Sequence, residues 1–175
     1  MKKQIIIIAA LFLFGGNLLF AQAQKIGYVD SQIILTQYAP AIKAQGDLDA
    51  LTNLWSSKVD SMTLAYQQQL NEYQKQANNM PQDKQLQAQQ KLIKMEQDIL
   101  DFRRQKFAQP DGEIFKKQEQ IFAPIKDKIY AAIKKVADQE GMKFIFDKSG
   151  DIILLYADPA FDITYKVLDA LKTGK

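Results

Sequence analysis

The residues that could carry catalytic chemistry in this sequence are few, and none belongs to a catalytic motif. The chain has no cysteine and no histidine, which excludes thiolate and imidazole metal sites and both Ser-His-Asp and Cys-His catalysis. Two acidic pairs remain, Asp98 with Asp101 and Asp111 with Glu113. Both lie in polar, helix-forming sequence, where side chains are normally solvated and lack the shaped pocket of a general acid or base. We predict no enzymatic activity and no cofactor.

The elements around these residues are two short apolar ends and a long middle rich in Gln and charged residues. Residues 25–30 form the first β-type segment, and 143–147, continued by 152–156, form the second. The ends can fold together only if the middle leaves them and returns. We therefore predict an α+β protein, with a β-rich body from 24–39 and 141–175 and a helical arm from 40–140.

The first 23 residues have the pattern of a secretory signal peptide. Lys2 and Lys3 precede an apolar run, and Ala21-Gln22-Ala23 is a small-x-small cleavage signature. The run is shorter than the roughly 20 residues of a membrane-spanning helix, although a retained anchor is the alternative. We predict cleavage after residue 23 and export of the mature protein.

Removal of this segment changes the charge of the protein. The chain has 23 basic and 20 acidic residues, and 1–23 contains two lysines and no acid, which leaves 21 minus 20, or +1. Net charge therefore gives no argument for nucleic-acid binding.

The outgoing half of the arm has helical periodicity and ends at a predicted tip near 78–82. Apolar residues recur at three- and four-residue steps, as on one face of a helix: Leu48, Leu51, Trp55, Val59, Met62, Tyr66, Leu70, Tyr73, Ala77 and Met80. Asn78, Asn79 and Pro81 then favour a turn, because Asn tolerates left-handed backbone and proline disrupts the preceding helical turn.

The return half contains an apolar residue at every seventh position. The column is Leu86, Ile93, Leu100, Phe107, Ile114 and Ile121, and Leu92, Met95, Ile99 and Phe102 widen it. A sustained seven-residue repeat indicates a left-handed coiled coil, so we predict an antiparallel coiled-coil hairpin. An ordinary helical bundle is the alternative.

Two prolines interrupt the return half. The column keeps its spacing across Pro110 and Gly112, so we predict a kinked but continuous helix with a hinge there, and a further hinge at Pro124. Gly141 is placed to cap the helix C-terminus.

The remaining residues predict a small body. The turn at 148–151 favours a β-hairpin, and Asp162 can cap a last helix. A body of about fifty residues has a marginal core and uncovered sheet edges, which predicts an oligomer of unspecified number.

The order of three short motifs resembles the Skp/OmpH family of periplasmic chaperones over essentially the whole chain after residue 23. The motifs are Ile26-Gly27-Tyr28-Val29-Asp30, Leu155-Tyr156-Ala157-Asp158 and Asp162-Ile163-Thr164. The resemblance implies a homotrimer with three helical tentacles around a cavity, and an ATP-independent holdase for unfolded outer-membrane β-barrel proteins. Strongly basic members use positive tentacles to meet clients and lipids. The charge of +1 departs from that pattern and gives weight to apolar contacts.

A holdase needs adaptable apolar patches, and flexible methionines and amphipathic aromatic residues suit that role. The candidates for client contact are Tyr66, Tyr73, Met80, Met95 and Phe102. Packing between the two arm helices is the alternative role, above all for Tyr73, Met95 and Phe102, and Met80 has the best case for exposure.

Six basic residues form a second candidate surface near the tip. They are Lys84, Lys91, Lys94, Arg103, Arg104 and Lys106, against four acids in 82–109. A surplus of two positive charges is typical of a solvated helix face with scattered ion pairs. The functional alternative is weak contact with lipid headgroups or acidic clients. Two other functions compete with the holdase: a coiled-coil tether of envelope components and an extracellular peptide-binding adaptor.

Overall fold

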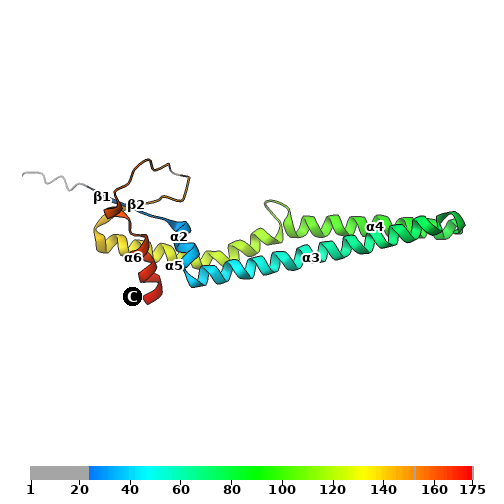
Figure 1. The fold of residues 1–175 in the computed structure, drawn as a ribbon, viewed down its shortest axis with the longest axis horizontal. Helices are drawn as coiled ribbons and strands as arrows, with labels where there is room; N and C mark the ends of the chain where they lie inside the picture. Colours follow the sequence, from blue (N-terminus) through cyan, green and yellow to red (C-terminus); the bar gives the residue numbers. More distant parts are fainter. Residues whose placement is uncertain (1–23, 152, 175) are drawn as a thin grey trace, which may run out of the picture.

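The computed structural model describes residues 24–151 and 153–174, so the predicted signal peptide lies outside the described residues. A small body carries a long arm of antiparallel helices (Figure 1). The elements in chain order are β1 (Lys25–Val29), α2 (Ser31–Gln37), α3 (Ala39–Gln76), the 3-10 turn η1 (Ala77–Asn79), α4 (Gln82–Phe107), α5 (Glu113–Glu140), β2 (Met142–Asp147), the 3-10 turn η2 (Pro159–Phe161) and α6 (Thr164–Thr173).

The two ends of the chain meet in a parallel pair of strands. Ile26 is opposite Phe144 and Val29 is opposite Asp147, with one register shift after Lys25. Parallel strands cannot be joined by a tight turn and need a long crossover. In this protein the crossover is α2 to α5, so the arm is an excursion within one strand–helix–strand connection.

The predicted β-hairpin after β2 is wrong. Residues 153–156 are not a strand, and β1 and β2 form a two-stranded sheet. After this irregular stretch the chain returns to the other side of β1, where the Ile163 N–H donates to the Tyr28 carbonyl at 3.0 Å. The apolar run at 152–156 satisfied the strand pattern, but the described residues of this run, 153–156, pair with neither strand of the sheet.

The core lies where the body meets the root of the arm. Ile34 of α2, with Val167 and Leu168 of α6, packs there against the C-terminal half of α5. Gly141 ends α5 in left-handed backbone (φ 67°) and confirms the predicted cap. Helix α6 begins at Thr164, one residue after its N-cap Ile163, and the Asp162 carboxylate accepts from the Thr164 N–H at 2.9 Å.

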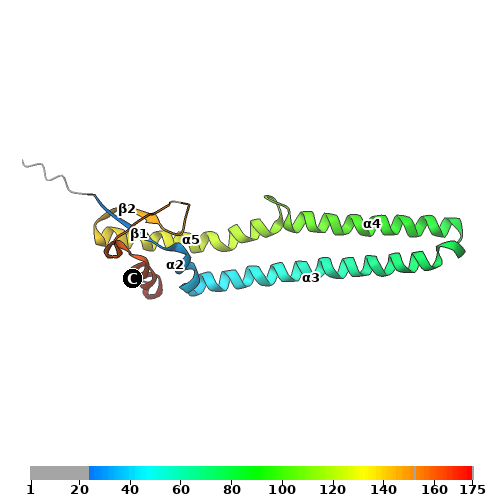
Figure 2. The same cartoon turned by 45° about the horizontal axis from the view of Figure 1, so that its top comes forward.

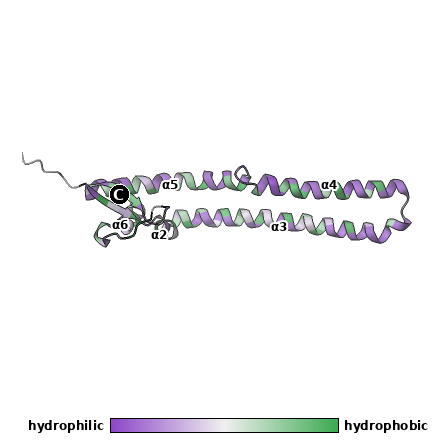
Figure 3. Cartoon of the chain, turned by 90° about the horizontal axis from the view of Figure 1, so that it is seen from above, coloured by the Kyte–Doolittle hydropathy of each residue, from purple (hydrophilic) through white to green (hydrophobic). Residues whose placement is uncertain are grey.

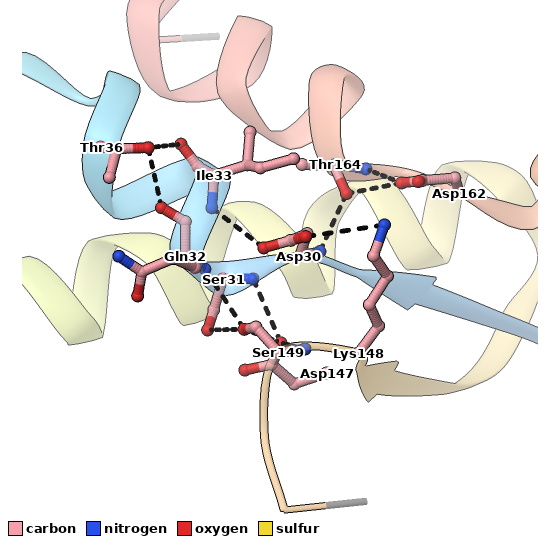
Figure 4. Close-up of polar contacts among 10 residues, drawn as sticks. All are labelled: Asp30, Ser31, Gln32, Ile33, Thr36, Asp147, Lys148, Ser149, Asp162 and Thr164. Carbon is pink, nitrogen blue, oxygen red and sulfur yellow. Dashed lines mark hydrogen bonds and ion pairs between the residues drawn. The ribbon is translucent and has the colours of Figure 1, made fainter. Parts of the chain in front are cut away.

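Polar side chains join the two ends of the chain around the start of α2 (Figure 4). Asp30 accepts from the Ile33 N–H at 3.0 Å and caps α2, while its own N–H donates to the buried Thr164 hydroxyl at 2.9 Å. Across the sheet, the Asp147 carboxylate accepts from the N–H groups of Ser31 and Ser149 at 3.1 and 3.0 Å. These bonds hold the N-terminal strand, the turn after β2 and α6 together.

The Asp147 carboxylate should make stability depend on pH. Burial raises the pKa of Asp147, but hydrogen bonds from Ser31 and Ser149 outweigh burial and hold the pKa below its ordinary value of 3.8. A carboxyl with a depressed folded pKa stabilises the fold above pH 3.8, and this contribution is lost as pH falls through the folded pKa. We expect Asp147→Asn to lower the urea midpoint at pH 7, and the difference from the unchanged protein to shrink as pH falls below 3.8 through the folded pKa. Asp151→Asn, an exposed change in the same turn, should have no effect, and a pH-independent loss for Asp147→Asn would contradict this cause.

The arm is a helical hairpin, with α3 returning through η1 into α4 and α5 (Figure 2). The 38 residues of α3 give a length of about 57 Å at 1.5 Å per residue. The turn is closed by Gln85, whose amide donates to the carbonyls of Ala77 and Met80 at 2.8 and 2.9 Å. Among the described residues, no helix is long and apolar enough to cross a membrane.

The return half is two helices, which corrects the prediction of one kinked helix. Helix α4 ends at Phe107, residues 108–112 form a loop that projects from the arm, and α5 begins at Glu113. Gly112 is required in this loop because a Cβ there would lie 2.6 Å from the Ala108 carbonyl oxygen. Pro124, by contrast, lies inside α5, which continues through it.

Candidate functional site

The contact between α3 and α4 follows a different column from the one the apolar pattern favours. On α4 the residues turned away from solvent between Gln82 and Lys106 repeat at three- and four-residue steps. We call them the seam: Gln85, Ala88, Leu92, Met95, Ile99, Phe102 and Lys106. This is a heptad pattern with Leu92 and Ile99 buried. The helical pairing was predicted, and the four residues that widen the predicted column, Leu92, Met95, Ile99 and Phe102, lie in the seam. The seven-spaced column itself was off by one residue.

The column predicted to pack between the helices is therefore exposed along α4 from Leu86 to Leu100, while Phe107, the last residue of α4, packs against Trp55. Leu86, Ile93 and Leu100 are 55%, 55% and 57% exposed. Each directly follows a seam residue in the sequence and therefore points about 100° around the helix axis from it. Because they are seven residues apart, the three form one line along the outside of α4. We call this line the outer stripe.

The five predicted contact residues are all partly buried. Met95 and Phe102 belong to the seam, and Tyr66 and Tyr73 are seven and fourteen residues beyond buried Val59 on the same face of α3. The Tyr73 hydroxyl accepts from Gln89 at 2.7 Å, which ties it to α4. Packing between helices thus accounts for four of the five.

Met80, the fifth candidate, lies at the tip, directly before Pro81 and the start of α4. It too is partly buried. The tip therefore offers less free apolar surface than its place at the end of the arm suggests.

The middle of the arm is fixed by an aromatic cluster close to the 108–112 loop. Trp55 of α3 is buried, and its ring meets Phe107 edge-on with 6.1 Å between centroids. The Lys106 ammonium lies 4.7 Å from the Trp55 centroid and also pairs with Glu113 of α5. One lysine thus links all three arm helices, and it is unavailable to a partner.

The other predicted basic residues are distributed among local partners. Lys94 pairs with Asp98 at 3.3 Å and Arg104 with Asp101 at 2.5 Å. Lys84 donates to Gln87 at 3.5 Å and Lys91 to Gln69 at 2.5 Å. Arg103 is exposed beside Asp60 and Phe107 at a shallow depression. Neighbouring positions such as Arg103 and Arg104 also point about 100° apart, so the six make no single basic face.

The predicted acidic pairs show no arrangement for catalysis. Asp98, Asp101 and Glu113 take part in the ion pairs above, and Asp111 is exposed in the loop. In the part of the chain that the structure describes, no group of three or more acidic residues is placed to hold a metal ion.

The body has exposed apolar residues that the sequence analysis did not name as candidate contacts. Ile26 and Phe144 are neighbours across the two strands and are 46% and 52% exposed. Later in the chain, Ile153, Leu155 and Tyr156 are each more than four-fifths exposed, and Tyr156 lines a cleft with Ile26. The signal was present in the alternating apolar residues of β2, but a sequence does not say which face of a strand is left uncovered.

These features define a class of protein: a small body that carries a long, nearly neutral helical hairpin. The sequence profile of the family described as "Outer membrane protein (OmpH-like)" matches residues 25–171. The chain belongs to this OmpH-like family.

A solved structure shows the same fold. The crystal structure of a protein from Caulobacter crescentus CB15, described as a candidate outer membrane chaperone (OmpH-like), superposes with a TM-score of 0.72. The two sequences are 14% identical, and the similarity covers 87% of this chain and 86% of that one. No curated protein matches the sequence.

Proposed function

We propose that the protein is an ATP-independent periplasmic holdase that keeps unfolded outer-membrane β-barrel proteins from aggregating. The observation that carries the proposal is the long hairpin on a small body, in a chain of the OmpH-like family. The described residues of the arm form no catalytic arrangement. We therefore base the proposed function on the length of the arm and on its surface, which can contact a client. The chaperone description of the Caulobacter relative points the same way.

We further propose that the protein works as a homotrimer whose arms surround the client. The body supports association, because the outer edge of β2 is unpaired in the described chain and the exposed Phe144 and Leu155 add uncovered apolar surface. A cleft of about 220 Å³ between β1, β2 and the 154–161 segment adds a concave apolar feature lined by Ile26 and Tyr156. A second copy that covered these groups would extend the small core of a single body.

Apolar contact and enclosure fit this arm better than electrostatic capture. The net charge from residue 24 onward is +1, and Lys94, Arg104 and Lys106 pair with acids of the arm itself. These basic side chains have acidic neighbours, so the arm presents little net positive potential to attract a partner. Several weak apolar patches on joined arms would instead bind through avidity.

An aggregation assay tests the proposed holdase. The purified protein, at a severalfold molar excess and without nucleotide, should keep a β-barrel outer-membrane protein soluble after dilution from urea, as measured by light scattering. Several unrelated unfolded barrels should bind with similar affinity. Aggregation at the rate of the barrel alone would contradict the holdase, and a single fixed folded partner would favour the envelope tether.

Solution mass from light scattering checks the trimer, and a compact monomer would exclude enclosure between arms.

A further inference from the structure

The outer stripe is an apolar feature that packing within this chain does not explain. Leu86, Ile93 and Leu100 have more than half of their surface in solvent, although every other exposed position of α4 is polar. Single exposed leucines are common on protein surfaces, but three in one line form a regularly repeated feature. The bands of apolar and polar residues along both arm helices are visible in Figure 3.

A partner helix, including α4 of a second copy, does not fit this stripe. A coiled-coil interface needs apolar residues at two positions in every seven. Between the stripe residues, the positions three and four along are Gln89, Gln90, Glu96 and Gln97. Three half-exposed aliphatic side chains also fall well short of the about 800 Å² that each partner buries in a stable interface. The stripe is therefore too narrow for a fixed helical partner.

An extended polypeptide fits the stripe in a weak and sequence-tolerant manner. The stripe residues are about 10.5 Å apart, and the stripe is about 21 Å long. Side chains on one face of an extended chain recur about every 6.7 Å, so three repeats span about 20 Å. The ends of the stripe can meet two client side chains, while the middle one matches no fixed position. Because the two spacings match only in part, we expect the stripe to bind many client sequences with similar, weak affinity.

We propose that the outer stripe of Leu86, Ile93 and Leu100 binds apolar side chains of extended, unfolded polypeptide. This inference rests on the proposed holdase function and assigns its contact surface to the outside of α4, in place of the seam residues Met95 and Phe102. The flanking glutamines keep the stripe solvated when it is empty. Of the four positions at three- and four-residue steps between the stripe residues, Glu96 is the one that carries a charge.

The test compares two triple variants in binding to a dye-labelled, urea-unfolded β-barrel outer-membrane protein. L86Q/I93Q/L100Q removes the stripe and should weaken binding about tenfold, because three apolar contacts are lost. I42Q/L54Q/L64Q is the matched control: these side chains of α3 are 53%, 65% and 56% exposed but lie ten and twelve residues apart. The control should bind within twofold of the unchanged protein.

A labelling experiment gives a direct readout. Since the chain has no cysteine, Ile93→Cys and Leu64→Cys each provide one attachment site for an environment-sensitive fluorophore. Addition of the unfolded barrel should shift the emission of the label at position 93 to the blue and leave the label at position 64 unchanged.

The outcomes separate this inference from the function on which it rests. If the unchanged protein binds the unfolded barrel and the stripe variant binds equally well, the stripe assignment is wrong and the holdase stands. Equal losses in both triple variants would also overturn the stripe, because general surface hydrophobicity would then explain binding. A lower solution mass for the stripe variant would assign the stripe to contact between copies. If the unchanged protein does not bind, both proposals fail.

Discussion

Replacing Trp55 with alanine should unfold the middle of the arm and cost about 3–5 kcal/mol of stability, the usual range for a buried tryptophan. Trp55 is the largest side chain packed between α3 and the return helices, and it is buried to 8% exposure. The substitution removes the edge-on contact with Phe107 and the ring beneath the Lys106 ammonium. Lys106 would then remain partly buried with Glu113 as its ion-pair partner, which adds to the loss.

The neighbouring residue provides the control. Leu54→Ala changes a side chain that is 65% exposed, so its effect should stay within about 0.5 kcal/mol. Urea unfolding followed by far-UV circular dichroism measures both changes, and hydrogen exchange should show faster opening at 51–59 and 99–107 for Trp55→Ala only. Equal effects of the two substitutions would mean that the aromatic cluster does not hold the arm together.

The seven-residue repeat predicted the helical hairpin, but it could not decide which column packs between the helices. Two apolar columns run one residue apart on α4, through Leu86 and Ile93 and through Leu92 and Ile99. The first looked stronger because it continues to Phe107, Ile114 and Ile121, while the second is interrupted by Gln85 and Lys106. Both polar residues have partners that a sequence does not reveal. Gln85 donates to backbone carbonyls at the tip, and Lys106 contacts Glu113 and the Trp55 ring.

The loop at 108–112 explains why that column was misleading. Counting by sevens across Pro110 assumes an unbroken helix, yet α4 ends at Phe107 and α5 starts at Glu113. The loop resets the helical phase, so Ile121 packs against the core while Leu100 faces solvent. The spacing of apolar residues predicts which of them share a helix face only while the helix is unbroken.

Replacing Ile34 with alanine should destabilise the body by about 2–5 kcal/mol, since a fully buried aliphatic side chain is lost and a cavity is left. Ile34 is 0% exposed in the core that joins α2, α5 and α6. Its neighbours include Val167 and Leu168 of the last helix, so the cavity would loosen the contact between the two ends of the chain. Ile42→Ala, at a side chain that is 53% exposed on α3, should cost less than about 0.5 kcal/mol.

The single tryptophan shows whether this loss reaches the arm. Trp55 fluorescence follows the arm, and far-UV circular dichroism follows all helices. The core includes Ala41 and Ala44 of α3 as well as Ile125 and Ile129 of α5, so the arm root and the body are one packed unit. We therefore expect Ile34→Ala to shift the urea midpoints of both signals together. If the Trp55 signal kept its midpoint while the total helical signal split into two steps, the arm would fold independently, and its stability would come from the Trp55 cluster and the seam alone.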